Sequence, residues 1–351
     1  MREIKVRAAK PYSVLIGQGL LKQAGAELRR ISGGTRCVIV SESNVAPLYS
    51  ETLKQSLSEA GFSVSVFVFP AGERSKNSDT YLSLLDHMAS HELTRSDLVV
   101  ALGGGVTGDM AGFAAATYLR GIDYAQIPTS LLAMVDSSVG GKTAIDLKSG
   151  KNYVGAFHQP KVVLCDTQLL ATLPQEFFLD GCGEVLKYAV LGDPELFEIL
   201  LRDGHDFPRE DVIARCVAQK EDFVAADEFE KGRRQMLNLG HTLGHAIEAV
   251  SNFELSHGRA VAAGLCMIAR ASAKRGLCSV DVVEQIENAA NALGLPTGTD
   301  VPVAALLKIA RGDKKRRNDS ISCVVPRTIG TCELLTLSLD DFERFAEGAS
   351  V

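Results

Sequence analysis

The first half of the chain alternates short apolar, β-branched runs with segments that carry the apolar spacing of a helix. Five such runs lie at 37–40, 64–69, 98–102, 124–127 and 162–165. Strands that alternate with helical segments are typical of a parallel sheet covered by helices. The pattern therefore predicts an α/β domain.

The second half of the chain has a different spacing of apolar residues. From about Glu176 to Ala310 most apolar residues recur with a period of 3.6, which predicts a mainly helical domain. A short hairpin is expected around 321–335 and a last helix near 339–347. A length of 351 residues makes two domains the starting expectation. We place them at 1–172 and 173–351.

Composition and charge narrow the class of protein. A composition of 46% apolar and 23% charged residues is typical of an ordered, globular protein. A net charge of −6 argues against a general nucleic-acid-binding surface. No apolar run reaches the roughly 18 residues of a membrane span, and the N-terminus has no apolar signal core. We therefore expect a cytoplasmic protein with neither a nucleic-acid nor a membrane partner.

The eight cysteines occur singly, without a CxxC pair, and most lie in apolar stretches. This distribution predicts reduced core residues and argues against a disulfide framework or a thiolate metal site.

A glycine-rich segment follows one predicted strand. Gly103-Gly104-Gly105-Val106-Thr107-Gly108-Asp109 satisfies GxGxxG and opens a helical pattern that runs from Met110 to Leu119. Such glycines let backbone N–H groups approach a pyrophosphate at a helix N-terminus. A purely structural turn would give the same signal, and the usual acidic residue about 20 positions later is not evident.

A second polar stretch begins at Pro128-Thr129-Ser130 and continues through 136–143 and Gly150-Lys151-Asn152. Its hydroxyls, glycines and lysines suit contacts to phosphate or polyol oxygens. A polar surface loop is the alternative interpretation.

A third segment carries titratable residues at helical spacing. Arg234, Asn238, His241, His245 and Glu248 are separated by 4, 3, 4 and 3 positions. On one continuous helix they would fall within about 80° of one face. The neighbouring leucines and Ile247 would form the buried face. A solvated stripe would more often use Glu and Lys than two His and an Asn.

Further metal-binding side chains lie nearby in sequence. His257 begins the next helical run, and Glu184 and Lys187 form an i, i+3 pair on an otherwise apolar helix. Two imidazoles and one carboxylate with an open position suit a catalytic zinc. The grouping favours a metal site over isolated core histidines.

In these residues the chain resembles the 3-dehydroquinate synthases, the sugar phosphate cyclases of the shikimate pathway. The resemblance extends, in the same order along the chain, from Ser41 to about Gly330. The segments that carry it are 103–109, 118–121, 136–143, 150–152, 183–188, 238–248 and 312–315. The resemblance implies a homodimeric, NAD-dependent lyase with a Rossmann-like α/β domain and a helical domain that binds one divalent metal, zinc or cobalt. The implied substrate, a phosphorylated sugar acid, is 3-deoxy-D-arabino-heptulosonate 7-phosphate, which is converted to 3-dehydroquinate and phosphate.

The resemblance also implies roles for individual residues. The metal ligands would be Glu184, His241 and His257. The substrate would contact Asp136, Lys142, Asn152, Lys187, Lys220, Arg234, Asn238, His245 and Lys314, with Arg120 reaching its phosphate from the other subunit. NAD would contact Glu42, Asn44, Glu73, Lys76, Gly104, Gly105, Val106, Thr107, Gly108, Asp109, Thr129, Ser130, Lys142, Lys151, Leu169, Leu170, Ala171 and Thr172.

Four positions depart from the usual family residues: Glu42, Ser130, Met134 and Arg259. Glu42 and Ser130 keep the carboxylate and the hydroxyl, whereas an arginine next to a metal ligand changes the chemistry there. Three alternatives stay open: another sugar phosphate cyclase, such as an epi-valiolone or deoxy-scyllo-inosose synthase; an iron-type alcohol or glycerol dehydrogenase; and an inactive binding homologue.

Overall fold

The computed structural model describes residues 1–251, 255–314 and 320–349. Its internal contacts divide the chain into two compact units. Unit 1 consists of Met1–Leu173 and Lys220–Phe229, and unit 2 consists of Pro174–Gln219 and Glu230–Val351. The segment Lys220–Phe229, which the apolar pattern grouped with the second half, thus lies with the first.

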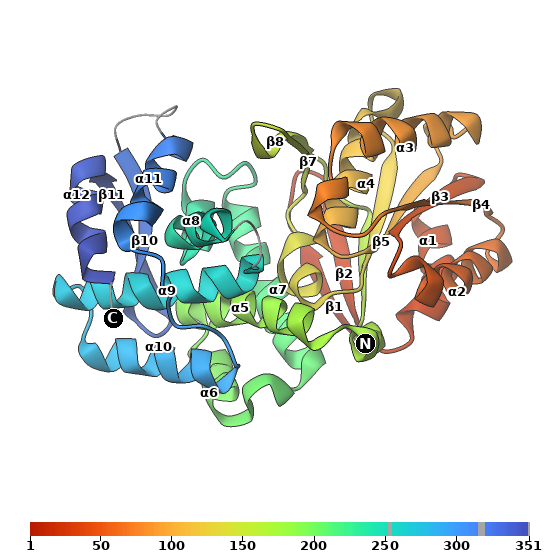
Figure 1. Cartoon of the computed structure of the whole chain (residues 1–351). Coiled ribbons are helices and arrows are strands. Elements are labelled where there is room, and N and C mark those ends of the chain that lie inside the picture. Colours follow the sequence, from red (N-terminus) through yellow and green to blue (C-terminus); the bar gives the residue numbers. More distant parts are fainter. Residues whose placement is uncertain (252–254, 315–319, 350–351) are drawn as a thin grey trace. The chain divides into compact units, whose positions relative to one another are not determined.

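Unit 1 is built on a seven-stranded sheet with the order β1-β2-β9-β6-β5-β3-β4 (Figure 1). Its strands are β1 (Arg2–Val6), β2 (Tyr12–Gly17), β3 (Arg36–Glu42), β4 (Ser63–Phe69), β5 (Leu98–Gly103), β6 (Asp123–Pro128) and β9 (Val162–Asp166). The β1–β2 pair is antiparallel, and all other pairings are parallel. The predicted α/β class is confirmed, and β3, β4, β5, β6 and β9 coincide with the five apolar runs.

The helices of unit 1 cover this sheet. They are α1 (Leu20–Ile31), α2 (Ala46–Glu59), α3 (Ser78–Ser90) and α4 (Gly105–Thr117), with short helical turns η1 (Glu73–Ser75), η2 (Tyr118–Arg120), η3 (Ala133–Ser137) and η4 (Thr167–Thr172). Helices α1 and α2 pack on each other, whereas α4 packs on β5 and β6. A separate hairpin of β7 (Lys142–Leu147) and β8 (Gly150–Phe157) lies against α4.

Unit 2 is mainly helical, as predicted. It contains α5 (Gln175–Gly192), α6 (Pro194–Asp203), most of α7 (Arg209–Ala226), α8 (His241–Val250), α9 (His257–Lys274), α10 (Val280–Ala292), α11 (Val303–Lys314) and α12 (Leu339–Ala346), with the turns η5 (Gly204–Asp206), η6 (Arg233–Asn238) and η7 (Glu347–Ala349). The expected hairpin is β10 (Ser320–Thr328) with β11 (Thr331–Ser338), an antiparallel pair. Within the described ranges, no helix combines the length and the apolar character that crossing a bilayer requires.

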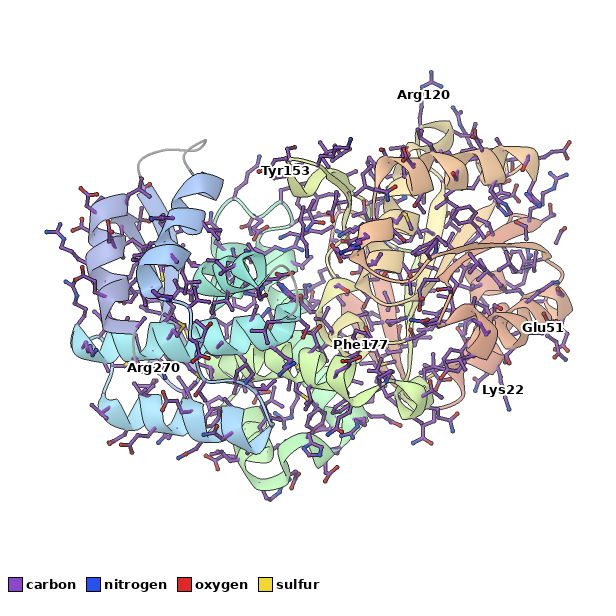
Figure 2. All side chains as sticks on the ribbon, in the orientation of Figure 1. Lys22, Glu51, Arg120, Tyr153, Phe177 and Arg270 are labelled. Atoms are coloured by element: carbon purple, nitrogen blue, oxygen red, sulfur yellow. The ribbon has the colours of Figure 1, made fainter. Side chains whose placement is uncertain are left out.

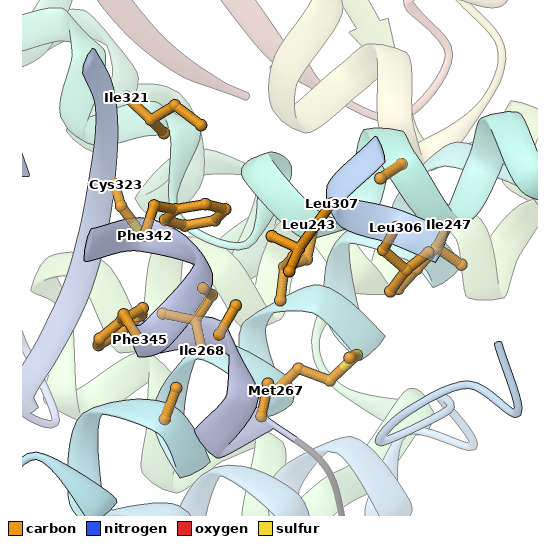
Figure 3. Packing of buried hydrophobic residues seen from close by; sticks show 14 of the residues in the cluster. Leu243, Ile247, Met267, Ile268, Leu306, Leu307, Ile321, Cys323, Phe342 and Phe345 are labelled. Carbon is orange, nitrogen blue, oxygen red and sulfur yellow. The ribbon is translucent and has the colours of Figure 1, made fainter. Parts of the chain in front are cut away.

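An apolar core fixes the orientation of α8 in unit 2 (Figure 3). Leu243 and Ile247 from α8 pack with Met267 and Ile268 from α9 and with residues of α11, β10 and α12. Leu243 and Ile247 are 0% and 1% exposed. Because burying each such side chain contributes about 2 kcal/mol, this face is strongly held inward, and the opposite face is left for polar residues.

Candidate active site

The glycine-rich segment forms the predicted turn between a strand and a helix. Strand β5 ends at Gly103, Gly104 is in an extended conformation, and α4 begins at Gly105. A Cβ on Gly108 would lie 2.5 Å from Gln126 Oε1, so this glycine permits close packing of α4 on β6. These are the roles that the glycines of a dinucleotide-binding turn have.

Polar residues of neighbouring strands meet this turn at the same edge of the sheet. Glu42 ends β3, whose residue Val40 pairs with Ala101 of β5, and its carboxylate accepts hydrogen bonds from the backbone of Asn44 (2.7 Å) and Val45 (3.0 Å). Thr129 follows β6, and its N–H donates to Gly103 O (3.0 Å). The Ser130 hydroxyl lies 3.5 Å from where a Gly104 Cβ would be. Parallel strands bind nucleotides at this carboxyl edge.

Lys76 is the centre of a polar network beside the glycine turn. Its ammonium donates to Asp109 Oδ2 and to Asn152 Oδ1, both at 2.6 Å, and lies 3.8 Å from Glu73 Oε1. Lys151 lies 3.8 Å from the same Glu73 oxygen. Burial raises the pKa of Asp109, although the Lys76 ammonium opposes this effect. Five residues predicted from the sequence are therefore brought together in unit 1.

Asp136 and Lys220 are far apart in sequence but form an ion pair. The Lys220 ammonium donates to the Asp136 backbone carbonyl (2.6 Å) and lies 2.9 Å from Asp136 Oδ1. Asp136 is in turn η3, and Lys220 is in the part of α7 that belongs to unit 1. Lys142, at the start of β7, is exposed.

The predicted segment of Leu169, Leu170, Ala171 and Thr172 lies in the turn η4. The Tyr49 hydroxyl from α2 holds this turn, because it donates to Leu169 O (3.3 Å) and is hydrogen-bonded to Thr172 Oγ1. The sequence analysis did not identify Tyr49 as a neighbour of this turn.

Arg120 lies at the other end of α4 from the glycine turn. Helix α4 ends at Thr117, earlier than the predicted 119, and Arg120 is exposed in the turn η2. Figure 2 shows its side chain projecting outward from unit 1. Leu119 and Arg120 have φ angles of 50° and 69°. Such angles cost non-glycine residues about 1–3 kcal/mol, so the surrounding structure has to hold this turn in place.

The expectation of one continuous helix from Arg234 to Glu248 was wrong. Arg234 and Asn238 lie in the turn η6, and α8 begins only at His241. The break falls at Gly240, whose φ of 79° is outside the helical range. A Cβ there would lie 2.6 Å from Val261 O, so the break lets the chain pass close to α9.

Nevertheless, unit 2 brings the predicted metal ligands together. Glu184 Oε1 lies 3.5 Å from His241 Nε2 and 3.3 Å from His257 Nε2, and Glu184 Oε2 lies 2.5 Å from the Lys187 ammonium. Glu184 and Lys187 are 0% and 1% exposed. A buried carboxylate oxygen that faces two imidazole nitrogens is a donor set suited to zinc or cobalt. These residues therefore fit one divalent metal.

His245 belongs to a second possible donor set. The ligand nitrogens of His241, His245 and His257 lie within 4.8 Å of one another. His245 is exposed, and the His245 and His257 rings are 5.6 Å apart. We favour the set with Glu184, because its oxygen is close to both Nε2 atoms and is buried.

The two histidines predicted to bind the metal have opposite pKa shifts. Burial lowers the pKa of His241 to about 3, and the positive charge of Lys187 adds to this effect. Burial also lowers the pKa of His257, but hydrogen bonds to Glu184 and Glu248 outweigh it and raise the pKa to about 10.

The remaining predicted residues of unit 2 are placed as follows. Arg234 is 1% exposed, and Asn238 Nδ2 donates to Glu230 Oε1 at 3.2 Å. Glu230 is a neighbour that the sequence did not indicate. Lys314 ends α11, and its side chain lies outside the described part of the structure, as does Lys315.

Glycines set the spacing of the helices that carry the predicted metal ligands. A Cβ on Gly183 of α5 would lie 1.9 Å from Gly258 O, and a Cβ on Gly258 of α9 would lie 1.8 Å from Asp180 O. Each of these glycines is adjacent to a predicted ligand, Glu184 or His257. Asp180 Oδ1 also accepts a hydrogen bond from Gly258 N (2.6 Å), which fixes the start of α9.

A Gly258→Ala substitution is expected to disturb this contact. The added methyl group would separate α5 from α9, so we expect a loss of about 1–3 kcal/mol in stability and weaker metal binding. Thermal unfolding and Co²⁺ titration measure the two effects. Gly33→Ala is the control, because no atom lies within 4 Å of the added Cβ and Gly33 is not among the glycines with a positive φ. Unchanged Co²⁺ affinity in Gly258→Ala would contradict this role.

Comparisons with known proteins show which family the chain belongs to. A family model described as 3-dehydroquinate synthase N-terminal matches residues 66–180, and one described as 3-dehydroquinate synthase C-terminal matches 181–316. The chain is 42% identical over 327 residues to the 3-dehydroquinate synthase of Clostridium acetobutylicum, with 92% of each chain covered. It is 45% identical over 338 residues to that of Caulobacter vibrioides, covering 92% of this chain and 91% of the relative. The chain belongs to the 3-dehydroquinate synthase family.

A solved structure supports the same conclusion for the fold. A 2-epi-5-epi-valiolone synthase from Streptomyces hygroscopicus subsp. jinggangensis, solved with NAD⁺ and Zn²⁺ bound, superposes with a TM-score of 0.87 at 28% identity. The match covers 96% of this chain and 95% of that one. The Rossmann-like α/β fold with a helical second part, predicted from the resemblance, is confirmed.

One departure from the family pattern, Arg259, follows directly after Gly258. Its backbone N–H lies 3.4 Å from Asp180 Oδ1 and so belongs to the same capping arrangement. Nothing in the described part of the structure explains the arginine side chain.

Proposed function

We propose that this member of the 3-dehydroquinate synthase family catalyses the family reaction, the conversion of 3-deoxy-D-arabino-heptulosonate 7-phosphate to 3-dehydroquinate and phosphate. The observation that carries the proposal is the cluster of the buried Glu184 with the partly buried His241 and His257, beside Lys187. The first three side chains would supply the donor atoms for a metal ion that acts as a Lewis acid. Lys187 would supply a positive charge for an anionic substrate.

The proposed cofactor contacts follow the clusters. NAD would be held at the carboxyl edge of the sheet by the glycine turn, Glu42, Thr129 and Ser130, and it would accept a hydride and return it within one turnover. One zinc or cobalt ion held by Glu184, His241 and His257 would lower the pKa of substrate hydroxyls.

This chain's own residues would bind, orient and neutralise the substrate. Lys187 and Arg234 are buried cations in unit 2, and Lys142 and Lys220 are cations of unit 1. A substrate that carries both a carboxylate and a phosphate needs several cationic side chains for its binding to a protein of net charge −6. The substrate's own phosphate would take the proton that is removed before elimination, so these side chains need only orient and stabilise charge.

We further propose a homodimer that works in the cytoplasm. In it, Arg120 of one subunit would contact the substrate phosphate of the other. The exposed position of Arg120 and its φ of 69° support this role.

A coupled assay of phosphate release from the heptulosonate tests the proposed reaction. We expect release that requires NAD, stops with a chelator and resumes with Zn²⁺ or Co²⁺, while no NADH accumulates. Equimolar NADH would show a dehydrogenase instead. Conversion of a different sugar phosphate, with the heptulosonate inert, would show another cyclase.

A Gly105→Ala substitution tests the NAD site. The new Cβ would lie 3.1 Å from Ser137 Oγ at the start of α4, where the backbone has to approach the pyrophosphate. We expect at least about tenfold weaker NAD binding, or about 1.4 kcal/mol, by calorimetry. The control is Gly33→Ala, because no atom lies within 4 Å of that Cβ. Equal NAD affinity in the two variants would rule out this role for the turn.

A further inference from the structure

In each of the two ligand histidines, the ring nitrogen that faces away from Glu184 has a hydrogen-bond partner. His241 Nδ1 lies 3.1 Å from the backbone carbonyl of Leu239, which leaves Nε2 facing Glu184. His257 Nδ1 lies 3.3 Å from Glu248 Oε2, and its Nε2 also faces Glu184. One imidazole is therefore supported by a backbone carbonyl and the other by a carboxylate.

The geometry points to Glu248 as a positioning residue that fixes the ring of His257 for metal binding. This inference rests on the metal site proposed above. Glu248 would accept the Nδ1–H hydrogen bond, so the lone pair of Nε2 would be directed at the metal.

The placement of Glu248 follows from α8. Glu248 is seven residues after His241, so the two lie on the same helix face, two turns and about 10 Å apart. Leu243 and Ile247 hold the other face in the apolar core. Helix α8 therefore supplies one ligand directly and supports the second ligand, which comes from α9.

Glu248 is not itself placed as a ligand. Its carboxylate approaches Nδ1, whereas the Glu184 carboxylate approaches Nε2, on the other side of the same ring. Glu248 is 8% exposed, so its carboxylate is largely shielded from water. A carboxylate behind a metal-bound histidine selects the ring tautomer and makes the other nitrogen a better donor. Removing such a partner typically lowers metal affinity by about 10- to 100-fold.

The test is a Co²⁺ titration of metal-free protein against a competing chelator, with the visible Co²⁺ spectrum as the second measurement. We expect Glu248→Ala to bind Co²⁺ about 10- to 100-fold more weakly, with shifted absorption bands. Glu248→Gln keeps the size of the side chain and a hydrogen-bond acceptor but loses the charge, and we expect a smaller loss.

Two further variants separate this role from others. Glu287→Gln, which removes the carboxylate paired with Arg270 on α9, is the matched control and should leave Co²⁺ affinity unchanged. His257→Ala should bind Co²⁺ much more weakly than either Glu248 variant. If His257→Ala binds like the wild type, the metal site is wrong and this inference falls with it.

If His257→Ala loses the metal while both folded Glu248 variants bind within twofold of the wild type with an unchanged spectrum, the inference about Glu248 alone is overturned. If Glu248→Ala does not fold, Glu248→Gln decides by the same two measurements. A lower unfolding temperature of the metal-free Glu248→Gln variant, with unchanged affinity and spectrum, would show a purely structural role.

Discussion

The Glu184→Gln variant is expected to lose its divalent metal and to retain less than about a thousandth of the wild-type turnover. Glu184 Oε1 lies within 3.5 Å of both ligand nitrogens, and a neutral amide replaces the only negative charge among the three proposed ligands. Loss of several kcal/mol of charge stabilisation corresponds to about a thousandfold or more in rate. Elemental analysis after dialysis and the phosphate-release assay measure the two losses.

The control for this prediction is His245→Ala. We expect this variant to keep its metal and to lose activity only through weaker substrate contacts. The opposite result, with metal retained in Glu184→Gln and lost in His245→Ala, would replace the Glu184 set by the three histidines that also lie close together.

Folding has to be checked in Glu184→Gln. The substitution leaves the Lys187 ammonium, which is 1% exposed, without a carboxylate partner at 2.5 Å. Breaking a buried ion pair by removing one partner can cost about 3–5 kcal/mol. His241→Ala removes a ligand without this cost, so metal loss in that variant with a normal unfolding temperature supports the same site.

The second large effect is expected from Arg120→Ala, which should be nearly inactive alone but active when mixed with His241→Ala. Helix α4 has 13 residues, so Arg120 lies about 20 Å along the axis from the glycine turn of its own unit. If Arg120 serves the other subunit, each heterodimer has one site with both lesions and one with neither. Random subunit exchange should then restore about a quarter of the wild-type activity.

Two outcomes would contradict this prediction. Near-normal activity of Arg120→Ala alone would make Arg120 an exposed arginine without a catalytic role. An inactive Arg120→Ala that is not rescued, under conditions where subunit exchange is demonstrated by mass labelling, would place Arg120 in the site of its own subunit.

The sequence predicted the strands that are buried on both faces. In β5 and β9 every residue is buried, and such strands read as continuous apolar runs. The strands β1, β2, β7 and β8 were not predicted. β8 (Gly150–Phe157) is half-exposed and contains glycines, a lysine and an asparagine, so its composition is that of a loop. Its pairing with β7 is irregular between Ile145 and Leu147, where the Asp146 carboxylate accepts the backbone N–H of Asn152 at 2.8 Å.

The residue types of the metal cluster were visible in the sequence, but their arrangement was not. A period of 3.6 between Arg234 and Glu248 suggested one helix, because spacing does not show the φ of 79° at Gly240. The contact between Glu248 and His257 joins two helices across nine positions of sequence. Asp180 lies four residues before Glu184 and therefore on the same face of α5. Its contact with the start of α9 could not be predicted, because it depends on how two helices pack.

Helix α7 limits how this protein could exchange segments with its relatives by recombination. Its residues up to Gln219 belong to unit 2, whereas Lys220 and Glu221 pair with Asp136 and Arg7 of unit 1. A single crossover after Leu173 would join the Asp136 turn of one parent to the Lys220 segment of another. A hybrid that inherits a complete unit 1 from one parent needs junctions after Leu173, within α7 and after Phe229.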